Sequence, residues 1–267
     1  MSIKKIIVLF ASSLLLGSCG EYQKLLKSSD PDLKYESALA FFNDGKYAKA
    51  LTLFEDVSSY YKGTERAQEV IIYLARSYMG MQQYLSSAEY YEVYLRNYPK
   101  GRYSTEARFQ VAHCYYLDSP DARLDQTETK KAIDYYLQFI ELYPQSPYAE
   151  QSYQELAELY NKLALKELKS AQLYYNLGTY LGDNYLSCEI VARNALKDYP
   201  SNAYCEEFCW LILASKYQRM VYSVDEKKGD RAREADDEYY SFITEYPESK
   251  HIKEAERFHK EIAKILQ

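Results

Sequence analysis

The chain is poor in the residues that interrupt helices, with only 9 glycines and 7 prolines among its 267 residues. A protein built of many short strands needs turn residues roughly every 8–12 positions, so this scarcity argues against an all-β fold. No segment shows a convincing alternation of apolar and polar residues either. The composition therefore favours long helices joined by few turns.

Side chains that commonly carry catalysis or bind metals are also scarce. The only histidines are His113, His251 and His259, and none of them has the His-x3-His spacing of a zinc-binding pair on one helix. No glycine-rich phosphate loop opens a helix, and no Ser-His-Asp set can be proposed from its spacing. We therefore expect a protein that is not an enzyme and has no cofactor and no metal site.

An excess of positive charge is absent, because the formal net charge is −6. Nucleic-acid binding depends on basic surface, so nucleic acid is not an expected partner, and charge-driven binding to anionic lipid is disfavoured. Tyrosine, in contrast, is abundant, with 32 residues. Its large apolar body and polar tip suit surfaces that pack and also meet water.

The first 18 residues have the features of an export signal. Lys4 and Lys5 precede an apolar run over residues 6–16, which is too short to span a bilayer comfortably. The run ends in Leu-Gly-Ser-Cys at residues 16–19, which resembles the bacterial lipobox, where signal peptidase II cleaves and the cysteine is acylated. An ordinary signal peptide with an incidental cysteine is the alternative. We expect a signal peptide over 1–18, lipidation of Cys19 and a tether over 19–29.

Acylation would fix where the protein works. One acyl chain anchors a protein only marginally, whereas two or three chains hold it in its membrane. Gly20 follows the cysteine, in place of the aspartate that resembles an inner-membrane retention signal in enteric bacteria. This favours an anchor in the outer membrane, on its periplasmic face.

From Asp30-Pro31 onward the pattern is helical, and one motif recurs. In Leu85–Pro99 the small residue Ser87 is followed on the same helix face by two tyrosines, and proline ends the helix. The related positions in the five occurrences are Ala50, Phe54 and Val57; Ser87, Tyr91 and Tyr94; Ala132, Tyr136 and Phe139; Cys188, Ala192 and Ala195; and Ala235, Tyr239 and Phe242.

A helix with its own pattern precedes each occurrence. In the fifth repeat it is Trp210-x2-Leu213-Ala214-x2-Tyr217, close to the tetratricopeptide pattern W-x2-L-G-x2-Y, and Ile71 and Arg108 hold the first position in the second and third repeats. The small residue lets two helices approach, and the aromatics fill the space to the next repeat.

These patterns predict an all-α fold, an α-solenoid of about five tetratricopeptide-like helix-turn-helix repeats. Residues 30–146 hold repeats 1–3, and residues 147–267 hold a long helix, repeats 4–5 and a C-terminal capping helix over Ser249–Leu266. The polar insertions Asp118–Glu128 and Ser223–Arg231 are expected to be surface loops or helix extensions.

Four cysteines follow Cys19, and their pattern leaves several roles open. Cys114, Cys188, Cys205 and Cys209 could form disulfides in an exported protein, and the last two are close to metal-ligand spacing. Packing is the simpler interpretation, because free cysteine behaves as a small buried hydrophobe. Cys188 also holds the small-residue position of the motif.

The first helices of stacked repeats line a concave surface, where extended peptides can bind. Residues next to the helix-packing alanine, or one turn from it on the same face, should point into this groove. In the first three repeats they are Tyr35, Leu39, Phe42, Arg76, Met79, Phe109, His113 and Tyr116. Such a surface suits a peptide with aromatic side chains and a free carboxylate near Arg76. Burial in the core is the alternative for each of them.

The lipobox, the tether, the degenerate repeats and recurring Tyr-Pro helix ends together resemble the BamD family of the β-barrel assembly machinery. The Tyr-Pro pairs are at residues 98–99, 143–144, 199–200 and 246–247. The long helix from Pro147, with Leu163–Leu168, and the segment Asn194–Pro200 are similar to that family in particular. The two insertions and the aromatics missing from the fourth repeat depart from its pattern.

This resemblance implies a non-enzymatic scaffold in the outer membrane. The N-terminal repeats would receive the C-terminal signal segments of unfolded outer-membrane proteins. The C-terminal repeats would bind the periplasmic domains of BamA, the barrel subunit, alongside other lipoproteins of the machinery. A scaffold for another envelope machine, serving cell-wall synthesis or secretion, is the alternative.

Replacing Cys19 tests the predicted anchor. In the Cys19→Ser variant no acyl chain can be attached, so the protein should move from the membrane pellet into the soluble fraction. Fractionation of cells followed by immunoblotting measures this. A variant that stays in the membrane fraction would contradict lipidation as the anchor.

Overall fold

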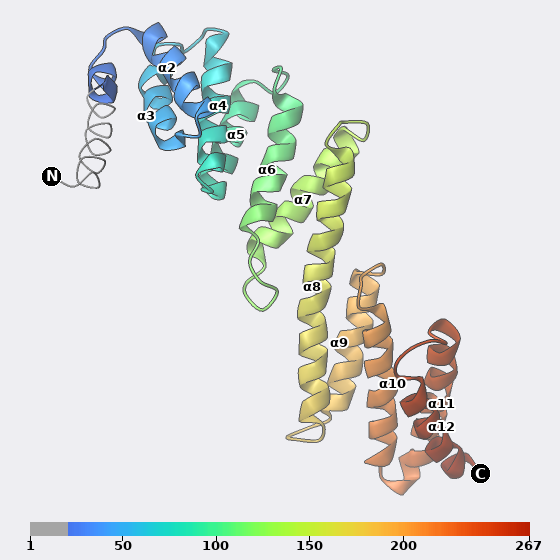
Figure 1. The fold of residues 1–267 in the computed structure, drawn as a ribbon. Helices are drawn as coiled ribbons and strands as arrows, with labels where there is room; N and C mark the ends of the chain where they lie inside the picture. The colour runs from blue at the N-terminus through green and yellow to red at the C-terminus, as the bar shows by residue number, and fades with distance from the viewer. Residues whose placement is uncertain (1–20) are drawn as a thin grey trace, which may run out of the picture. The chain divides into compact units, whose positions relative to one another are not determined.

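The computed structural model describes residues 21–267, and all of its regular elements in this range are helices (Figure 1). The predicted all-α class is therefore confirmed. The signal peptide predicted over 1–18 and the predicted lipidation site Cys19 lie outside the described residues. Within residues 21–267, no helix has the length and apolar character needed to cross a membrane.

The helices form consecutive pairs, as the repeat pattern predicts. Those of the first three pairs are α2 (Pro31–Asn43), α3 (Tyr47–Ser58), α4 (Arg66–Gly80), α5 (Tyr84–Asn97), α6 (Ser104–Asp118) and α7 (Thr127–Leu142). The remaining helices are α8 (Ala149–Leu177), α9 (Asn184–Asp198), α10 (Cys205–Val221), α11 (Asp225–Glu245) and α12 (Ile252–Leu266). The last helix packs on α10 and α11, so five tetratricopeptide-like pairs and a capping helix are confirmed.

The chain forms two compact units. Unit 1 comprises the residues up to Ser119 together with Glu128–Ser152, and unit 2 comprises Pro120–Thr127 and Tyr153–Gln267. Each unit has its own buried clusters of small and aromatic side chains.

Local signals explain where the helices start and stop. The Asp30 side chain accepts hydrogen bonds from the backbone amides of Asp32 and Leu33, at 3.0 and 3.1 Å, and Pro31 is the first residue of α2. The tyrosines that precede proline end α5, α9 and α11, with φ of −135°, −131° and −127°. A residue before proline is pushed out of the helical region, so each Tyr-Pro pair ends its helix.

The recurring small-aromatic motif lies in the core. Ser87, Ala88, Tyr91 and Tyr94 are all buried, and the Ser87 hydroxyl donates to the Ala75 carbonyl of the paired helix at 2.9 Å. A larger side chain at this position would push α4 and α5 apart. The motif therefore sets the spacing within each pair of helices.

The four described cysteines are free. Cys188 is fully buried among the small residues of α8 and α9, at the motif position that alanine holds in other repeats. Burial raises the pKa of the Cys114 thiol to about 12. These side chains thus serve as small packing groups.

The two insertions differ in structure. Ser223–Arg231 mainly extends a helix, because α11 already begins at Asp225. The Asp118–Glu128 segment is a loop that is only partly on the surface, since Ala122 and Gln126 are buried. The ammonium of Lys166 on α8 donates to the Leu124 carbonyl at 2.7 Å, which holds this loop within unit 2.

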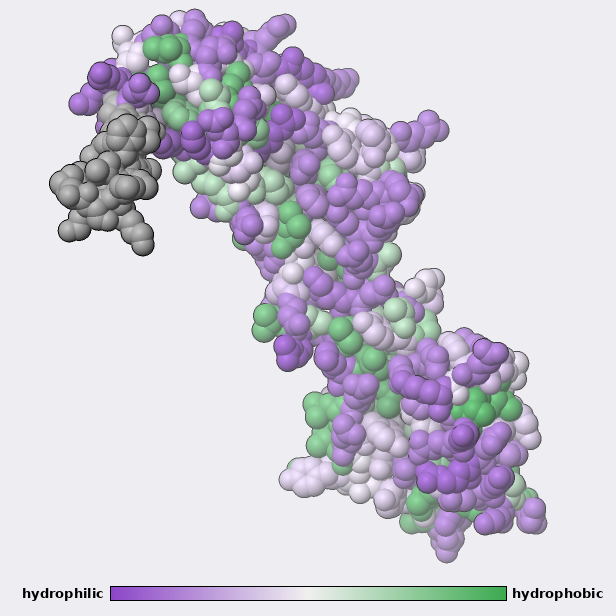
Figure 2. All heavy atoms as spheres, viewed as in Figure 1, coloured by the Kyte–Doolittle hydropathy of each residue, from purple (hydrophilic) through white to green (hydrophobic). Residues whose placement is uncertain are grey.

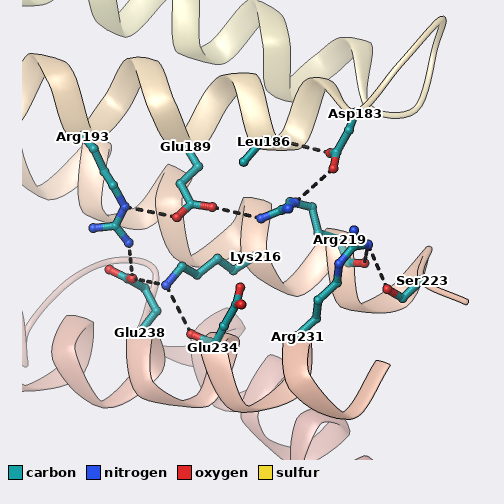
Figure 3. A network of polar contacts seen from close by, with 10 residues as sticks. All are labelled: Asp183, Leu186, Glu189, Arg193, Lys216, Arg219, Ser223, Arg231, Glu234 and Glu238. Carbon is teal, nitrogen blue, oxygen red and sulfur yellow. Dashed lines mark hydrogen bonds and ion pairs between the residues drawn. The ribbon is translucent and has the colours of Figure 1, made fainter. Parts of the chain in front are cut away.

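A network of charged side chains joins α9, α10 and α11 in unit 2 (Figure 3). Glu238 binds both Arg193 and Lys216, at 2.7 and 2.8 Å, through the same oxygen, Oε2. Glu189 in turn binds Arg193 and Arg219, at 3.1 and 3.3 Å. The side chains of Lys216 and Glu238 are only 13% and 16% exposed, so this pair is largely shielded from solvent, whereas the Arg193 side chain is 47% exposed.

The Glu238→Gln variant tests the contribution of this network. Removing the shared carboxylate leaves Lys216 without its carboxylate partner and Arg193 with Glu189 alone, which should cost about 1–3 kcal/mol of unfolding free energy. Urea unfolding can be followed by fluorescence of Trp210, the single tryptophan, which lies in unit 2.

The matched control is Asp230→Asn, because the Asp230–Arg233 pair is exposed. Exposed pairs contribute about 0–1 kcal/mol, so this change should have little effect. Equal unfolding midpoints for the two variants would show that the network adds nothing to stability.

Candidate functional site

One face of unit 1 carries paired charges that connect successive first helices. Asp32 on α2 binds Arg66 on α4 at 2.5 Å, and Arg76 on α4 binds Glu106 on α6. Glu69 on α4 binds Arg102, which lies just before α6. Arginine and carboxylate thus alternate along this surface, which we call the charged face.

Arg76 makes three hydrogen bonds to a single partner on the charged face. Its Nη2 donates to both carboxylate oxygens of Glu106, at 2.6 and 2.8 Å, and its Nε donates to Oε1 at 3.0 Å. The guanidinium also lies over the rings of Tyr73 and Tyr103, with centroids at 5.5 and 5.7 Å. Burial acts to lower the pKa of Arg76, but hydrogen bonding to Glu106 and its negative charge raise that pKa overall. The side chain predicted to bind a carboxylate therefore already binds one from this chain.

An open polar pocket of about 520 Å³ lies on the same face. Glu65, Arg66, Gln68, Glu69 and Arg102 line it. The hydrogen bond from Tyr35, followed by contacts with Arg102, holds the pKa of Glu69 below its usual value. This keeps Glu69 ionised and paired.

The sequence prediction missed the pocket residues Arg66, Glu69 and Arg102. A signal for two of them was present, because Arg66, Glu69, Tyr73 and Arg76 follow one another at spacings of three and four, which places them on one stripe of α4. Arg102 lies outside a helix, so helical periodicity could not identify it.

The predicted groove residues fall into two groups, and the first surrounds α2 and α4. Tyr35 is only 3% exposed and packs on Phe54, while its hydroxyl donates to Glu69 at 2.5 Å. Phe42 is half-buried with its ring 5.1 Å from Tyr73, the ring over which Arg76 lies. Leu39 packs at the edge of the same core, and Met79 packs at the edge of the core between α4, α5 and α6.

The second group is a run of stacked rings along α6. Phe109 is 2% exposed and stacks on Tyr148 at 4.6 Å, His113 stacks on Phe109 at 5.5 Å, and Tyr116 lies 5.9 Å from His113. His113 and Tyr116 are half-buried and so retain exposed surface. Tyr148, which the sequence analysis did not single out, extends this run.

Tyr148 also connects the aromatic run to Arg76. Burial raises the pKa of Tyr148, and the nearby charge of Glu106 raises it further, whereas the charge of Arg76 lowers it. The arginine-carboxylate pair and the stacked rings are therefore close neighbours. This arrangement offers a guanidinium and half-buried aromatic edges to a ligand, but no nucleophile with an adjacent base.

Other chemistry has little support in the part of the chain that the structure describes. Residues 21–267 hold no group of three or more His, Cys, Asp or Glu side chains placed to share a metal ion. In the view of Figure 2, hydrophilic side chains cover much of both units and hydrophobic ones form small separate patches. These observations are typical of a surface that binds through local polar and aromatic contacts.

Comparisons with known proteins point to one family. The profile of the family YfiO, described as outer membrane lipoprotein, matches residues 28–182. No curated protein matches the chain.

Solved structures with tetratricopeptide-like repeats are similar at a distance. A Podosopora anserina kinesin light chain repeat protein is 14% identical, with 87% of this chain and 92% of that chain covered and a TM-score of 0.39. The TPR2AB domain of yeast Sti1, in its pHSP90 complex, is 10% identical, with 87% and 98% covered and a TM-score of 0.39. Likenesses this distant do not inform function.

Proposed function

Because the chain belongs to the outer membrane lipoprotein family YfiO, we propose that it is a lipid-anchored scaffold of the β-barrel assembly machinery. In this role it binds unfolded outer-membrane proteins and the periplasmic domains of BamA, and it promotes insertion of barrels into the outer membrane. The family match is the observation that carries the proposal. The lipobox at residues 16–19 supports an anchor at Cys19, on the periplasmic face.

Substrate binding is assigned to the charged face and the aromatic run of unit 1. A peptide that ends in an aromatic residue carries a ring and a terminal carboxylate. The ring would pack on the half-buried edges of His113 and Tyr116, and the carboxylate would bind Arg76.

Glu106 gives this site an exchange mechanism. The incoming carboxylate would replace Glu106 on Arg76, so a bidentate pair is broken and another is formed. Because the two pairs are chemically alike, the exchange costs little and the peptide is held reversibly. Glu106 would then keep Arg76 extended and hydrogen-bonded when no peptide is present.

The fold suits a role without catalysis. Repeat arrays present extended surfaces for other proteins, and this chain forms two compact units, which we propose bind substrate and partner separately. Unit 2, with repeats 4 and 5, is the part proposed to bind BamA. The alternative is a scaffold for another envelope machine, since repeat lipoproteins serve several assemblies.

Variants of Arg76, Tyr116 and Glu106 test the peptide site. Arg76→Ala and Tyr116→Ala should each weaken binding of a peptide that ends in phenylalanine by about tenfold, which corresponds to about 1.4 kcal/mol for a lost charge-assisted or aromatic contact. Glu106→Gln should instead tighten binding several-fold, because it removes the competing carboxylate. Fluorescence anisotropy with a labelled peptide measures these affinities.

Two controls make this test specific. Arg123→Ala removes an exposed arginine from the Pro120–Thr127 segment of unit 2, so it should leave the affinity unchanged. The same peptide with a C-terminal amide should not distinguish Glu106→Gln from the wild type. Unchanged affinity in Arg76→Ala and Tyr116→Ala, with helicity intact by circular dichroism, would remove both residues from the site.

Depletion of the protein tests its place in barrel assembly. Levels of outer-membrane barrel proteins should fall, and a mild-detergent pull-down should contain BamA. Unchanged barrel levels on depletion would overturn the proposal. Cell-wall enzymes in the pull-down without BamA would support the alternative scaffold.

A further inference from the structure

The third repeat carries a charged residue at the first position of the repeat pattern. Trp210 begins the fifth-repeat pattern, where it is 9% exposed and stacks on Phe258. The corresponding residue in the second repeat is the half-buried Ile71. In the third repeat it is Arg108, so a guanidinium lies where the second and fifth repeats use an apolar group.

The Nε of Arg108 has an unmet hydrogen-bonding requirement in the described part of the chain. Its Nε is shielded from solvent and has no hydrogen-bond partner among the described residues. An N–H that is buried without an acceptor costs free energy, so such groups are rare in folded proteins. The missing acceptor is an observation that points to a ligand.

Lys34 shows how the same position accommodates a charge when it is structural. Lys34 is the first-repeat counterpart of Arg108, and it is 8% exposed. Its ammonium donates to the Leu26 carbonyl at 3.0 Å and pairs with Asp56. Residues 21–267 therefore supply partners for the Lys34 ammonium but none for the Arg108 Nε.

Arg108 also lines a cavity formed by residues of α5, α6 and α7. The recess measures about 60 Å³, and its lining includes Glu92, Leu95, Arg108, Tyr135, Phe139 and Leu142. An open depression of about 340 Å³ shares several of these residues and adds Arg96. We call the two together the α5–α7 pocket. A water occupies about 10–15 Å³ by the same kind of measure, so the recess can hold a carboxylate.

Charge in the α5–α7 pocket favours an anion. Arg96 and Arg108 contribute two positive charges, against the single carboxylate of Glu92, whose Oε1 already accepts the Tyr135 hydroxyl at 2.6 Å. The protein as a whole is negative, with a formal charge of −6. A local positive site on an acidic protein selects a small anionic group and disfavours a broad anionic surface such as a bilayer.

Part of the pocket wall is apolar. Leu95 and Phe139 contribute to it, and Leu142 at the rim is 59% exposed. A ligand that fills the site therefore needs an apolar group beside its anionic group. A protein segment with an aspartate or glutamate next to leucine-like residues has both.

We propose that the α5–α7 pocket binds a partner protein through an acidic side chain flanked by apolar residues. The carboxylate accepts the Nε–H of Arg108 in the recess and is attracted by Arg96, while an apolar neighbour covers Leu95 and Leu142. This site is separate from the peptide site proposed above. Arg108 and Phe109 are adjacent on α6, and consecutive helical residues point about 100° apart.

Blocked peptides test the proposal on the full-length chain in detergent. The probes are acetyl-Leu-Glu-Leu-Leu-amide and the same peptide with glutamine in place of glutamate. Neither has a free terminal carboxylate, so exchange with Glu106 does not contribute. Titration followed by NMR should show that the glutamate peptide binds at least about tenfold more tightly than the glutamine peptide, as expected for a charge-assisted contact.

Matched variants assign this preference to Arg108. Arg108→Met should abolish the preference for glutamate, and it should raise the melting temperature by a few degrees, because it removes an unsatisfied N–H. Lys34→Met, at the same repeat position, should lower the melting temperature and leave peptide binding unchanged. Arg76→Ala should also leave binding of the blocked peptides unchanged. The test of the α5–α7 pocket and the test of the proposed function can therefore fail independently.

Three outcomes would overturn the proposal. The first is equal binding of the two peptides to the wild type, and the second is a preference that survives in Arg108→Met. The third is a rise in melting temperature for Arg108→Met while neither peptide binds, which would identify a water-filled cavity.

Flotation with phosphatidylglycerol and phosphatidylcholine vesicles tests whether the ligand is a lipid. If Arg108→Met no longer binds phosphatidylglycerol vesicles but still binds the peptide, the ligand of Arg108 is a lipid headgroup and not a partner protein.

Discussion

Close approach of paired helices over small residues is the constraint on which the rest of the fold depends. Ala75 and Ser87 are both fully buried, and a hydrogen bond joins the Ser87 hydroxyl to the Ala75 carbonyl where α4 meets α5. In unit 2 Cys188 and Ala192 play the same part. Once the helix pairs are this close, aromatic side chains are needed to fill the space between repeats. The size of a few side chains therefore sets the geometry on which every surface site is built.

The abundant tyrosines join this packing to the polar surface. Several place their ring in a core while their hydroxyl donates to a carboxylate on another helix, as Tyr35 does to Glu69, Tyr61 to Asp32 and Tyr135 to Glu92. A phenylalanine would pack equally well but would remove one hydrogen-bond donor from each of those carboxylates. The charged face of unit 1 is consequently fixed by residues that also stabilise the core. Changes at its tyrosines should affect binding and folding together, whereas changes at Arg76 or Glu106 affect mainly binding.

Periodicity in the sequence predicts the helices, their pairing and the capping helix, because these depend on local spacing and on Tyr-Pro stops. It predicts less of the candidate site. Arg76 lies on the expected stripe of α4, but its partner Glu106 is 30 residues away in the sequence. Whether the two side chains meet depends on how one repeat packs on the next. Tyr35 and Phe109 also lie on the expected helices, yet the structure places their rings in the core. A helical face can be predicted from sequence, but the depth of each residue below the surface depends on neighbouring repeats.

The first position of the repeat pattern shows a difference between repeats that the sequence pattern cannot predict. Trp210, Lys34 and Arg108 hold equivalent places, and the pattern alone treats them as substitutions at a packing site. The structure separates them: Trp210 fills its space, Lys34 has partners at hand, and the Nε of Arg108 has none. Natural proteins depart from local packing and hydrogen-bonding preferences mainly at functional sites. A cation that costs stability and faces an opening is therefore better explained by a missing ligand than by the fold.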